Sequence, residues 1–159
     1  PRTVSSAASD VYKRQTTKLI YHILKSAGLD VGLAGNIGDS FSKMLLTGDK
    51  DIYVLEISSF QLDDIKKFRP NISVITNIIE DHLDRYENDF GKYVDAKMKI
   101  AKNQKSSDYL IYNSDDKILL EALRVNRLEV NKIPIGINTQ KQNQITLDKK
   151  ILYNKKKLL

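Results

Sequence analysis

A short apolar run that contains one carboxylate constrains the fold more than any other feature of this sequence. Residues 52–57 read Ile-Tyr-Val-Leu-Glu-Ile, and the only charged side chain among them is Glu56. Such a run is typical of a strand that is buried on both faces, as in a parallel sheet. A buried carboxylate is costly unless it finds a cation or hydrogen-bond donors. Glu56 is therefore either a ligand-binding residue at the carboxyl end of a strand or a glutamate that merely ends it.

Strand-like and helix-like segments alternate on both sides of this run. Further strands are expected at 31–34, 72–76, 109–112 and 132–135. Helices are expected at 16–27, from residue 39 or 40 to Leu46, from about Leu62 to Phe68, at 90–102 and up to about Leu123. This alternation predicts an α/β fold with a doubly wound, mostly parallel sheet and flanking helices, which ends in a β-hairpin of 145–147 and 151–153.

Three polar side chains follow strands of this predicted sheet. Asn36 lies in the loop Gly35-Asn36-Ile37-Gly38, Glu56 ends the central run, and His82 lies in the polar loop after 72–76. Because the loops after parallel strands gather at one edge, these residues are expected to share a rim and form a site.

Composition narrows the class of protein. The chain has 159 residues, enough for a domain with its own core, and 41% of them are hydrophobic. Cysteine is absent, which excludes disulfides and thiolate metal sites. Since no apolar run approaches the length of a membrane span and no signal peptide is recognisable, we expect a cytoplasmic protein that does not contact a membrane.

The net charge of +6 is concentrated at the two ends of the chain. Residues 149–159 carry five lysines and no acid, and residues 1–15 carry a net +2. The intervening 18 basic and 19 acidic residues leave a net charge of −1 on the body of the chain. A nucleic-acid footprint should lie on the fold itself, so we expect no nucleic-acid partner.

Residues 1–15 show no clear periodicity and do not share the helical pattern that begins at Thr16. We interpret this segment as non-native, because 10–15 (Asp-Val-Tyr-Lys-Arg-Gln) resembles a translated adapter sequence. Residues 16–159 are then the region to which the fold prediction applies.

Two further residues carry open alternatives. Lys97 interrupts the apolar stripe of the helix expected at 90–102, so it either extends its charge to solvent, pairs with an acid or is chemically modified. His82 follows Asp81 at the end of a strand and is either structural or a ligand. Any metal bound by such oxygen and nitrogen groups together with phosphates would favour Mg²⁺.

Taken in order, four motifs resemble the central domain of the Mur ligase family. They are Gly35-Asn36-Ile37-Gly38, Glu56-Ile57-Ser58-Ser59-Phe60-Gln61-Leu62, Asn77-x-x-x-Asp81-His82-Leu83-Asp84-Arg85-Tyr86 and Tyr93-x-x-Ala96-Lys97. Ser58 to Leu62 is most similar to the branch of the family that adds D-glutamate to UDP-N-acetylmuramoyl-L-alanine. The resemblance covers about 16–159 and implies a partial central, ATP-hydrolysing domain.

The resemblance implies a chemistry and a set of roles. The family uses ATP to phosphorylate the substrate's carboxylate, and an amino acid then attacks the acyl phosphate to form an amide in peptidoglycan precursor synthesis. Glu56 would bind the Mg²⁺ that bridges the ATP phosphates, and His82 would bind a second Mg²⁺. Lys97 would act as a metal-bridging carbamate. Asn36, Ser58 and Gln61 would line the side of the muramoyl substrate. A monomer is expected.

One departure from the family pattern keeps other functions open. The family's phosphate loop, Gly-x-x-Gly-Lys-[Thr/Ser]-Thr, falls in a register where this chain has residues 9–15, and Ser9 and Tyr12 replace the glycines. A loop without these glycines should not cradle phosphates, so the chain by itself is expected to be inactive. A non-catalytic nucleotide-sugar-binding module, another specificity within the family and a basic nucleic-acid binder are the alternatives.

Overall fold

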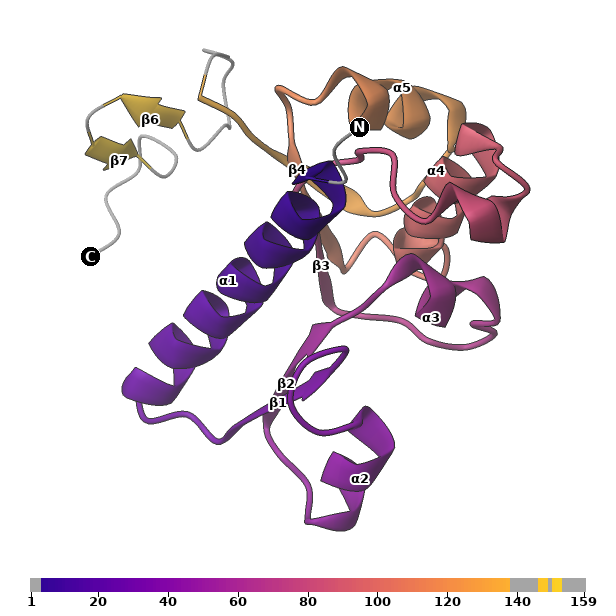
Figure 1. Cartoon of the computed structure of the whole chain (residues 1–159). Helices are drawn as coiled ribbons and strands as arrows, with labels where there is room; N and C mark the ends of the chain where they lie inside the picture. The colour runs from indigo at the N-terminus through magenta and orange to yellow at the C-terminus, as the bar shows by residue number, and fades with distance from the viewer. Residues whose placement is uncertain (1–3, 138–145, 149, 153–159) are drawn as a thin grey trace. The chain divides into compact units, whose positions relative to one another are not determined.

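The computed structural model describes residues 4–137, 146–148 and 150–152, which form two compact units that meet within one short helix (Figure 1). The first unit extends to Leu62 and the second begins at Asp63. The first contains α1 (Val4–Ser26), β1 (Val31–Gly35), α2 (Phe41–Leu46), β2 (Ile52–Glu56) and most of α3 (Ser59–Asp63). The second contains β3 (Ile72–Ile75), the 3₁₀ turn η1 (Leu83–Tyr86), α4 (Phe90–Met98), the 3₁₀ turn η2 (Lys99–Ala101), β4 (Tyr109–Asn113), α5 (Lys117–Val125), β5 (Asn131–Ile135), β6 (Thr146–Asp148) and β7 (Lys150–Leu152).

In the first unit, β1 and β2 form a parallel pair that α1 contacts. The register aligns Val31 with Ile52 and Gly35 with Glu56, so both strands end at the same edge. α1 presents only part of its surface to other residues, since Leu19 and Ile23 are more than half exposed. α2 begins as predicted, because the Ser40 hydroxyl accepts a hydrogen bond from the backbone N–H of Lys43 and so caps the helix.

α1 is longer than the sequence pattern indicated. The helix was expected to begin near Thr16, but it begins at Val4 and is continuous to Ser26. Residues 4–15 contain neither proline nor glycine and include alanine, lysine, arginine and glutamine, which favour helix, so nothing in them stops the helix. Gly28, two residues after the helix, has a φ of 81°, in the left-handed region that commonly follows a helix C-terminus.

In the second unit, β3, β4 and β5 form a parallel sheet in that order. One face is buried through Ile75 and Leu110, and the core continues into α5 through Leu119. α5 is strongly amphipathic and is capped by Asp116, whose carboxylate accepts the backbone N–H of Leu119 at 3.0 Å. The opposite face of β3 is more open, since Ile72 is 59% exposed.

A buried ion pair joins the segments that lead into β3 and β4. The Arg69 guanidinium donates to Asp108 through two nitrogens, at 2.7 and 3.1 Å, and the Asp108 side chain is 2% exposed. The backbone N–H of Lys105 donates to the same carboxylate at 2.8 Å. These hydrogen bonds hold the pKa of Asp108 below its usual value, the guanidinium making the larger contribution.

The predicted fold class is confirmed: open parallel sheets are flanked by helices, and an antiparallel hairpin of β6 and β7 follows. Among the described residues the parallel strands form two ladders, β1-β2 and β3-β4-β5, instead of one. α3 ends at Asp63, well before the expected Phe68. No helix within the described part of the chain is long and apolar enough to span a membrane.

Candidate functional site

The first unit places Glu56 and Asn36 side by side through their backbones. The backbone N–H of Asn36 donates to the Glu56 carbonyl at 2.8 Å, one residue beyond the aligned pair Gly35 and Glu56. A Cβ atom on Gly35 would lie 2.1 Å from the Glu56 carbonyl oxygen, and Gly35 has a φ of 108°. Only glycine permits this close approach, so Gly35 fixes the position of Asn36 relative to Glu56.

The Glu56 side chain is buried without a hydrogen bond. It is 3% exposed, and neither carboxylate oxygen accepts a hydrogen bond from a described residue. The ammonium of Lys13, on α1, lies 3.9 Å from Oε1, which is an ion-pair distance. A carboxylate whose lone pairs are unused is suited to a cation, because a metal ion would satisfy both oxygens. Glu56 therefore fits the predicted Mg²⁺ ligand.

Ser58 and Gln61 form a small structure at the start of α3. The side-chain oxygen Oε1 of Gln61 accepts the backbone N–H of Ser58 at 2.9 Å and lies 3.2 Å from the Ser58 hydroxyl. Ser58 is buried, whereas Gln61 is exposed. The contact caps the first turn and brings together two of the three residues expected on the substrate side.

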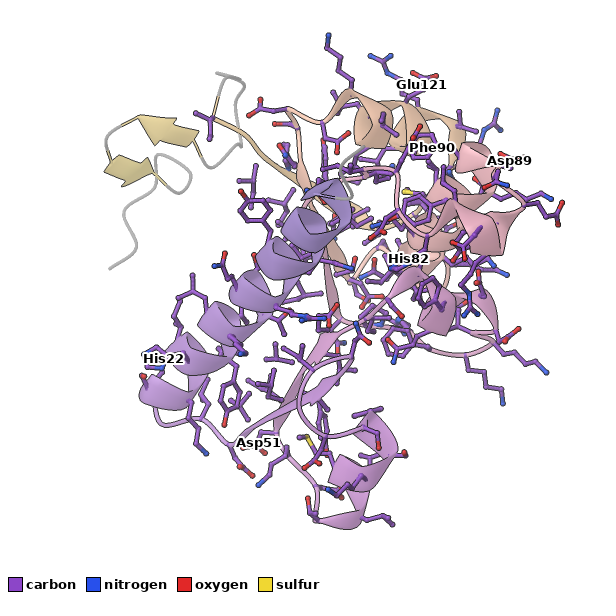
Figure 2. All side chains as sticks on the ribbon, in the orientation of Figure 1. His22, Asp51, His82, Asp89, Phe90 and Glu121 are labelled. Atoms are coloured by element: carbon purple, nitrogen blue, oxygen red, sulfur yellow. The ribbon has the colours of Figure 1, made fainter. Side chains whose placement is uncertain are left out.

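His82 has an unusual backbone conformation at the start of η1. Its φ and ψ are 49° and 37°, in the left-handed region, which residues other than glycine seldom adopt. Its side chain is about half exposed, and Nε2 lies 3.5 Å from a carboxylate oxygen of Asp81, which is 5% exposed. Figure 2 shows His82 in the segment that precedes α4, whose first residue, Phe90, is also labelled. Backbone strain of this kind is common at functional sites.

Lys97 is partly buried on α4. Its Nζ lies 4.9 Å from the centre of the Tyr93 ring, a cation–π distance. The Tyr93 ring in turn meets the Tyr86 ring edge-on, with centroids 5.5 Å apart. Tyr93 thus connects the lysine to η1, the turn that His82 precedes.

Asp116, a residue to which sequence analysis gave no role, holds the loop after β3. The backbone N–H of Ile78 donates to Asp116 Oδ2 at 2.7 Å. The neighbouring Asn77 has a buried side-chain oxygen, Oδ1, that accepts no hydrogen bond from a described residue. The sequence carries no signal for this contact, because it joins positions 38 residues apart and uses a backbone donor.

The predicted site draws Glu56 from the first unit and both His82 and Lys97 from the second. Within the first unit, Asn36 contacts Glu56 through the backbone, and Ser58 contacts Gln61. Within the described residues, no three histidine, aspartate or glutamate side chains group so that they could hold a metal ion. A common site for Glu56, His82 and Lys97 stays a prediction.

The segment in the register of the family's phosphate loop is helical. Residues 9–15, the register of the family's phosphate loop, lie inside α1. Backbone N–H groups within a helix are used by the helix itself and are not free to surround a phosphate. This segment therefore does not fit the phosphates of ATP.

Parallel strands, a glycine-flanked loop and a buried carboxylate at the carboxyl edge are features of open α/β proteins, a class whose ligands bind at that edge. The chain also matches the family model of the Mur ligase middle domain over residues 13–157. It belongs to the Mur ligase family.

Two similar relatives bear the name of the same ligase of that family. The chain is 44% identical over 131 residues to the UDP-N-acetylmuramoylalanine–D-glutamate ligase of Christiangramia forsetii, a match that covers 82% of the chain and 29% of that protein. It is 48% identical over 124 residues to the ligase of the same name from Bacteroides thetaiotaomicron, covering 78% of the chain and 28% of that protein. The chain thus spans less than a third of the length of these relatives.

Solved structures agree on the fold. MurF ligase from Thermotoga maritima, in complex with ADP, superposes with a TM-score of 0.62 at 20% identity, over 80% of this chain and 31% of that one. A UDP-N-acetylmuramoyl-L-alanyl-D-glutamate–2,6-diaminopimelate ligase superposes with a TM-score of 0.56 at 16% identity, over 79% of this chain and 30% of that one.

Proposed function

We propose that residues 16–159 are part of the central domain of an ATP-dependent ligase that joins D-glutamate to UDP-N-acetylmuramoyl-L-alanine. The proposal rests on the family, on the 44% and 48% identities to ligases that bear this name, and on the motif from Ser58 to Leu62. A cytoplasmic, monomeric enzyme of peptidoglycan precursor synthesis is part of the same proposal.

The observation that carries the proposal is the state of Glu56. Its carboxylate is 3% exposed and accepts no hydrogen bond from a described residue, at the strand end where this fold class binds ligands. A glutamate that merely ended a strand would turn its charge to solvent. A buried acid with unused lone pairs instead supports a cation ligand.

Each candidate residue has a part in this proposal. Glu56 and His82 would supply oxygen and nitrogen to Mg²⁺, and Lys97 would add a carboxylate once carbamylated. Asn36, Ser58 and Gln61 would orient the muramoyl substrate, with Ser58 fixed by its contact to Gln61. Mg²⁺ would neutralise charge where two anionic reactants meet.

A chimaera tests this function, because the chain spans only part of its relatives. Residues 16–137 would replace the matching segment of the Bacteroides thetaiotaomicron ligase, which would keep its own phosphate loop. Ligation of D-glutamate is expected, and Glu56→Gln should lower turnover by about two orders of magnitude or more, because the amide keeps the shape and loses the charge.

The matched control in this chimaera is Glu121→Gln. Glu121 lies on the exposed surface of α5, where its side chain is 67% exposed. Near-normal turnover is expected for this variant. An active chimaera in which Glu56→Gln is equally harmless would return Glu56 to a structural role.

A non-catalytic nucleotide-sugar-binding module remains the second candidate. The observation in its favour is the helix that occupies the register of the phosphate loop. Binding of UDP-N-acetylmuramoyl-L-alanine by the chain, together with a chimaera that binds it but forms no amide, would favour the module.

A further inference from the structure

The side-chain oxygen of Asn77 is a buried hydrogen-bond acceptor without a donor among the described residues. Asn77 is the second residue after β3, and its Oδ1 atom is buried without a hydrogen bond from a described residue. Buried acceptors are nearly always paired, and one that is not requires an explanation such as a ligand or an ion. The orphan oxygen is therefore evidence for a missing donor.

The backbone around Asn77 is fixed from two sides. β3 precedes it in the parallel ladder with β4, and the next residue, Ile78, donates its N–H to Asp116 Oδ2 at 2.7 Å. Ile78 is 1% exposed, so its side chain anchors the loop in the core. The other oxygen of Asp116 caps α5 through Leu119. Asp116 thus positions Asn77 by joining the loop after β3 to a helix.

The charge of this region indicates what the missing donor is. The loop from Asn77 to Tyr86 contains Glu80, Asp81 and Asp84 but only one fixed cation, Arg85. An anionic ligand would be repelled here, whereas a cation would be attracted. A carbonyl oxygen, moreover, accepts hydrogen bonds or binds cations and cannot donate to an anion.

We infer that Asn77 Oδ1 accepts a hydrogen bond from a water molecule of a hydrated divalent cation bound at this edge. Mg²⁺ keeps several of its waters when protein side chains bind it, and each of these waters is a strong donor. The inference rests on the proposed function, because the cation is the one assigned to His82. It adds Asn77 as a further binding residue and Asp116 as its positioning residue.

The test compares two asparagine-to-leucine variants of the full chain, with Mn²⁺ as the probe. Asn77→Leu removes an unsatisfied acceptor at similar volume, so the melting temperature without metal should stay the same or rise. Mn²⁺ binding, followed by electron paramagnetic resonance, should weaken about tenfold or more, as for other losses from the outer shell of a metal.

Asn103→Leu is the matched control. The side-chain amide of Asn103 donates to the carbonyls of Lys66 and Phe68 at 3.1 and 2.9 Å. Losing these bonds should lower the melting temperature while Mn²⁺ affinity is unchanged. The two variants should therefore show opposite patterns of stability and metal binding.

Three results would overturn the inference. They are a wild-type chain that binds no Mn²⁺, an Asn77→Leu variant that melts earlier to the same extent as Asn103→Leu, and an Asn77→Leu variant with unchanged Mn²⁺ affinity. Failure of the proposed function is a separate outcome, because it appears as a chimaera that forms no amide whatever residue stands at position 77. A ligation-competent chimaera that tolerates Asn77→Leu would reject the role of Asn77 alone.

Discussion

In the structure, Lys97 occupies a position that suits its positively charged ammonium. The proposed enzyme instead requires Lys97 to carry a negatively charged carbamate. Its ammonium lies over the face of Tyr93, whose quadrupole attracts positive charge. A carbamate at the same place would be repelled by the ring. Carbamylation, in which the neutral amine attacks carbon dioxide, therefore requires the side chain to leave the ring face.

The carbamate hypothesis predicts how substitutions at Lys97 behave in the full-length chimaera. Lys97→Ala should lose most ligation activity, and added acetate or formate should restore part of it by filling the vacated position. Lys97→Arg should fail as well, because arginine stays protonated and forms no carbamate, although it preserves the contact with the ring. The measurement is turnover with and without the added carboxylate. Near-normal turnover of Lys97→Arg would rule the carbamate out.

At the scale of the elements, the ion pair of Arg69 and Asp108 predicts how the second unit responds to acid. The pKa of Asp108 is lowered in the fold, first by the hydrogen bond from Arg69 and next by that from Lys105. The pair therefore contributes its full stability above the ordinary aspartate pKa, about 3.9, and that contribution is lost as the pH falls through the lower folded pKa.

The matching experiment is a melting series of the full chain from pH 7 to pH 2. Asp108→Asn should melt about 5 °C or more below the wild type at pH 7, because one partner of a buried pair is lost. The difference should shrink below about pH 4, where the carboxylate of the unfolded chain becomes protonated, and it should vanish once the pH falls below the lower folded pKa. Glu121→Gln, which alters the exposed pair with Arg124, is the control and should follow the wild type. A constant difference at every pH would contradict the assignment.

The limits of sequence-based prediction are clearest in the helices. Strands at 31–35, 52–56 and 72–75 were predictable because apolar runs and glycines mark them. α1 was not placed correctly, since the irregular pattern of residues 4–15 hid a stretch with no helix breaker. α3 stops at Asp63 although Ile65 and Phe68 continue the helical spacing, so periodicity alone overestimated it.

The candidate site was predictable where one strong motif names a residue. Glu56 was identified because a carboxylate in a buried run is rare, and its burial is now observed. The hydrogen bond between Ile78 and Asp116 joins positions 38 residues apart and involves a backbone group, so no local pattern reveals it. The ion-pair distance between Lys13 and Glu56 was equally hidden, because Lys13 lay in the segment excluded from fold prediction.

At the scale of the whole molecule, residues 9–15 do not fit the phosphates of ATP, although the described part of the chain keeps an acid suited to a metal ion. Residues 9–15 are helical, and Tyr12 stands where the family has a glycine. The chain also spans less than a third of its relatives. We therefore expect the chain by itself neither to hydrolyse ATP nor to ligate D-glutamate.

The measurement is phosphate release with UDP-N-acetylmuramoyl-L-alanine, D-glutamate, ATP and Mg²⁺, compared between the chain and its Glu56→Gln variant. Both should give the same background, because removing the charge of Glu56 matters only where the nucleotide phosphates are held. The chimaera has a glycine loop from its host. Its turnover with Glu56 should therefore exceed that of its Glu56→Gln variant by about two orders of magnitude. Turnover by the chain well above its own Glu56→Gln variant would show that α1 gives way to a phosphate-binding conformation. The assignment of residues 9–15 to a stable helix would then be wrong.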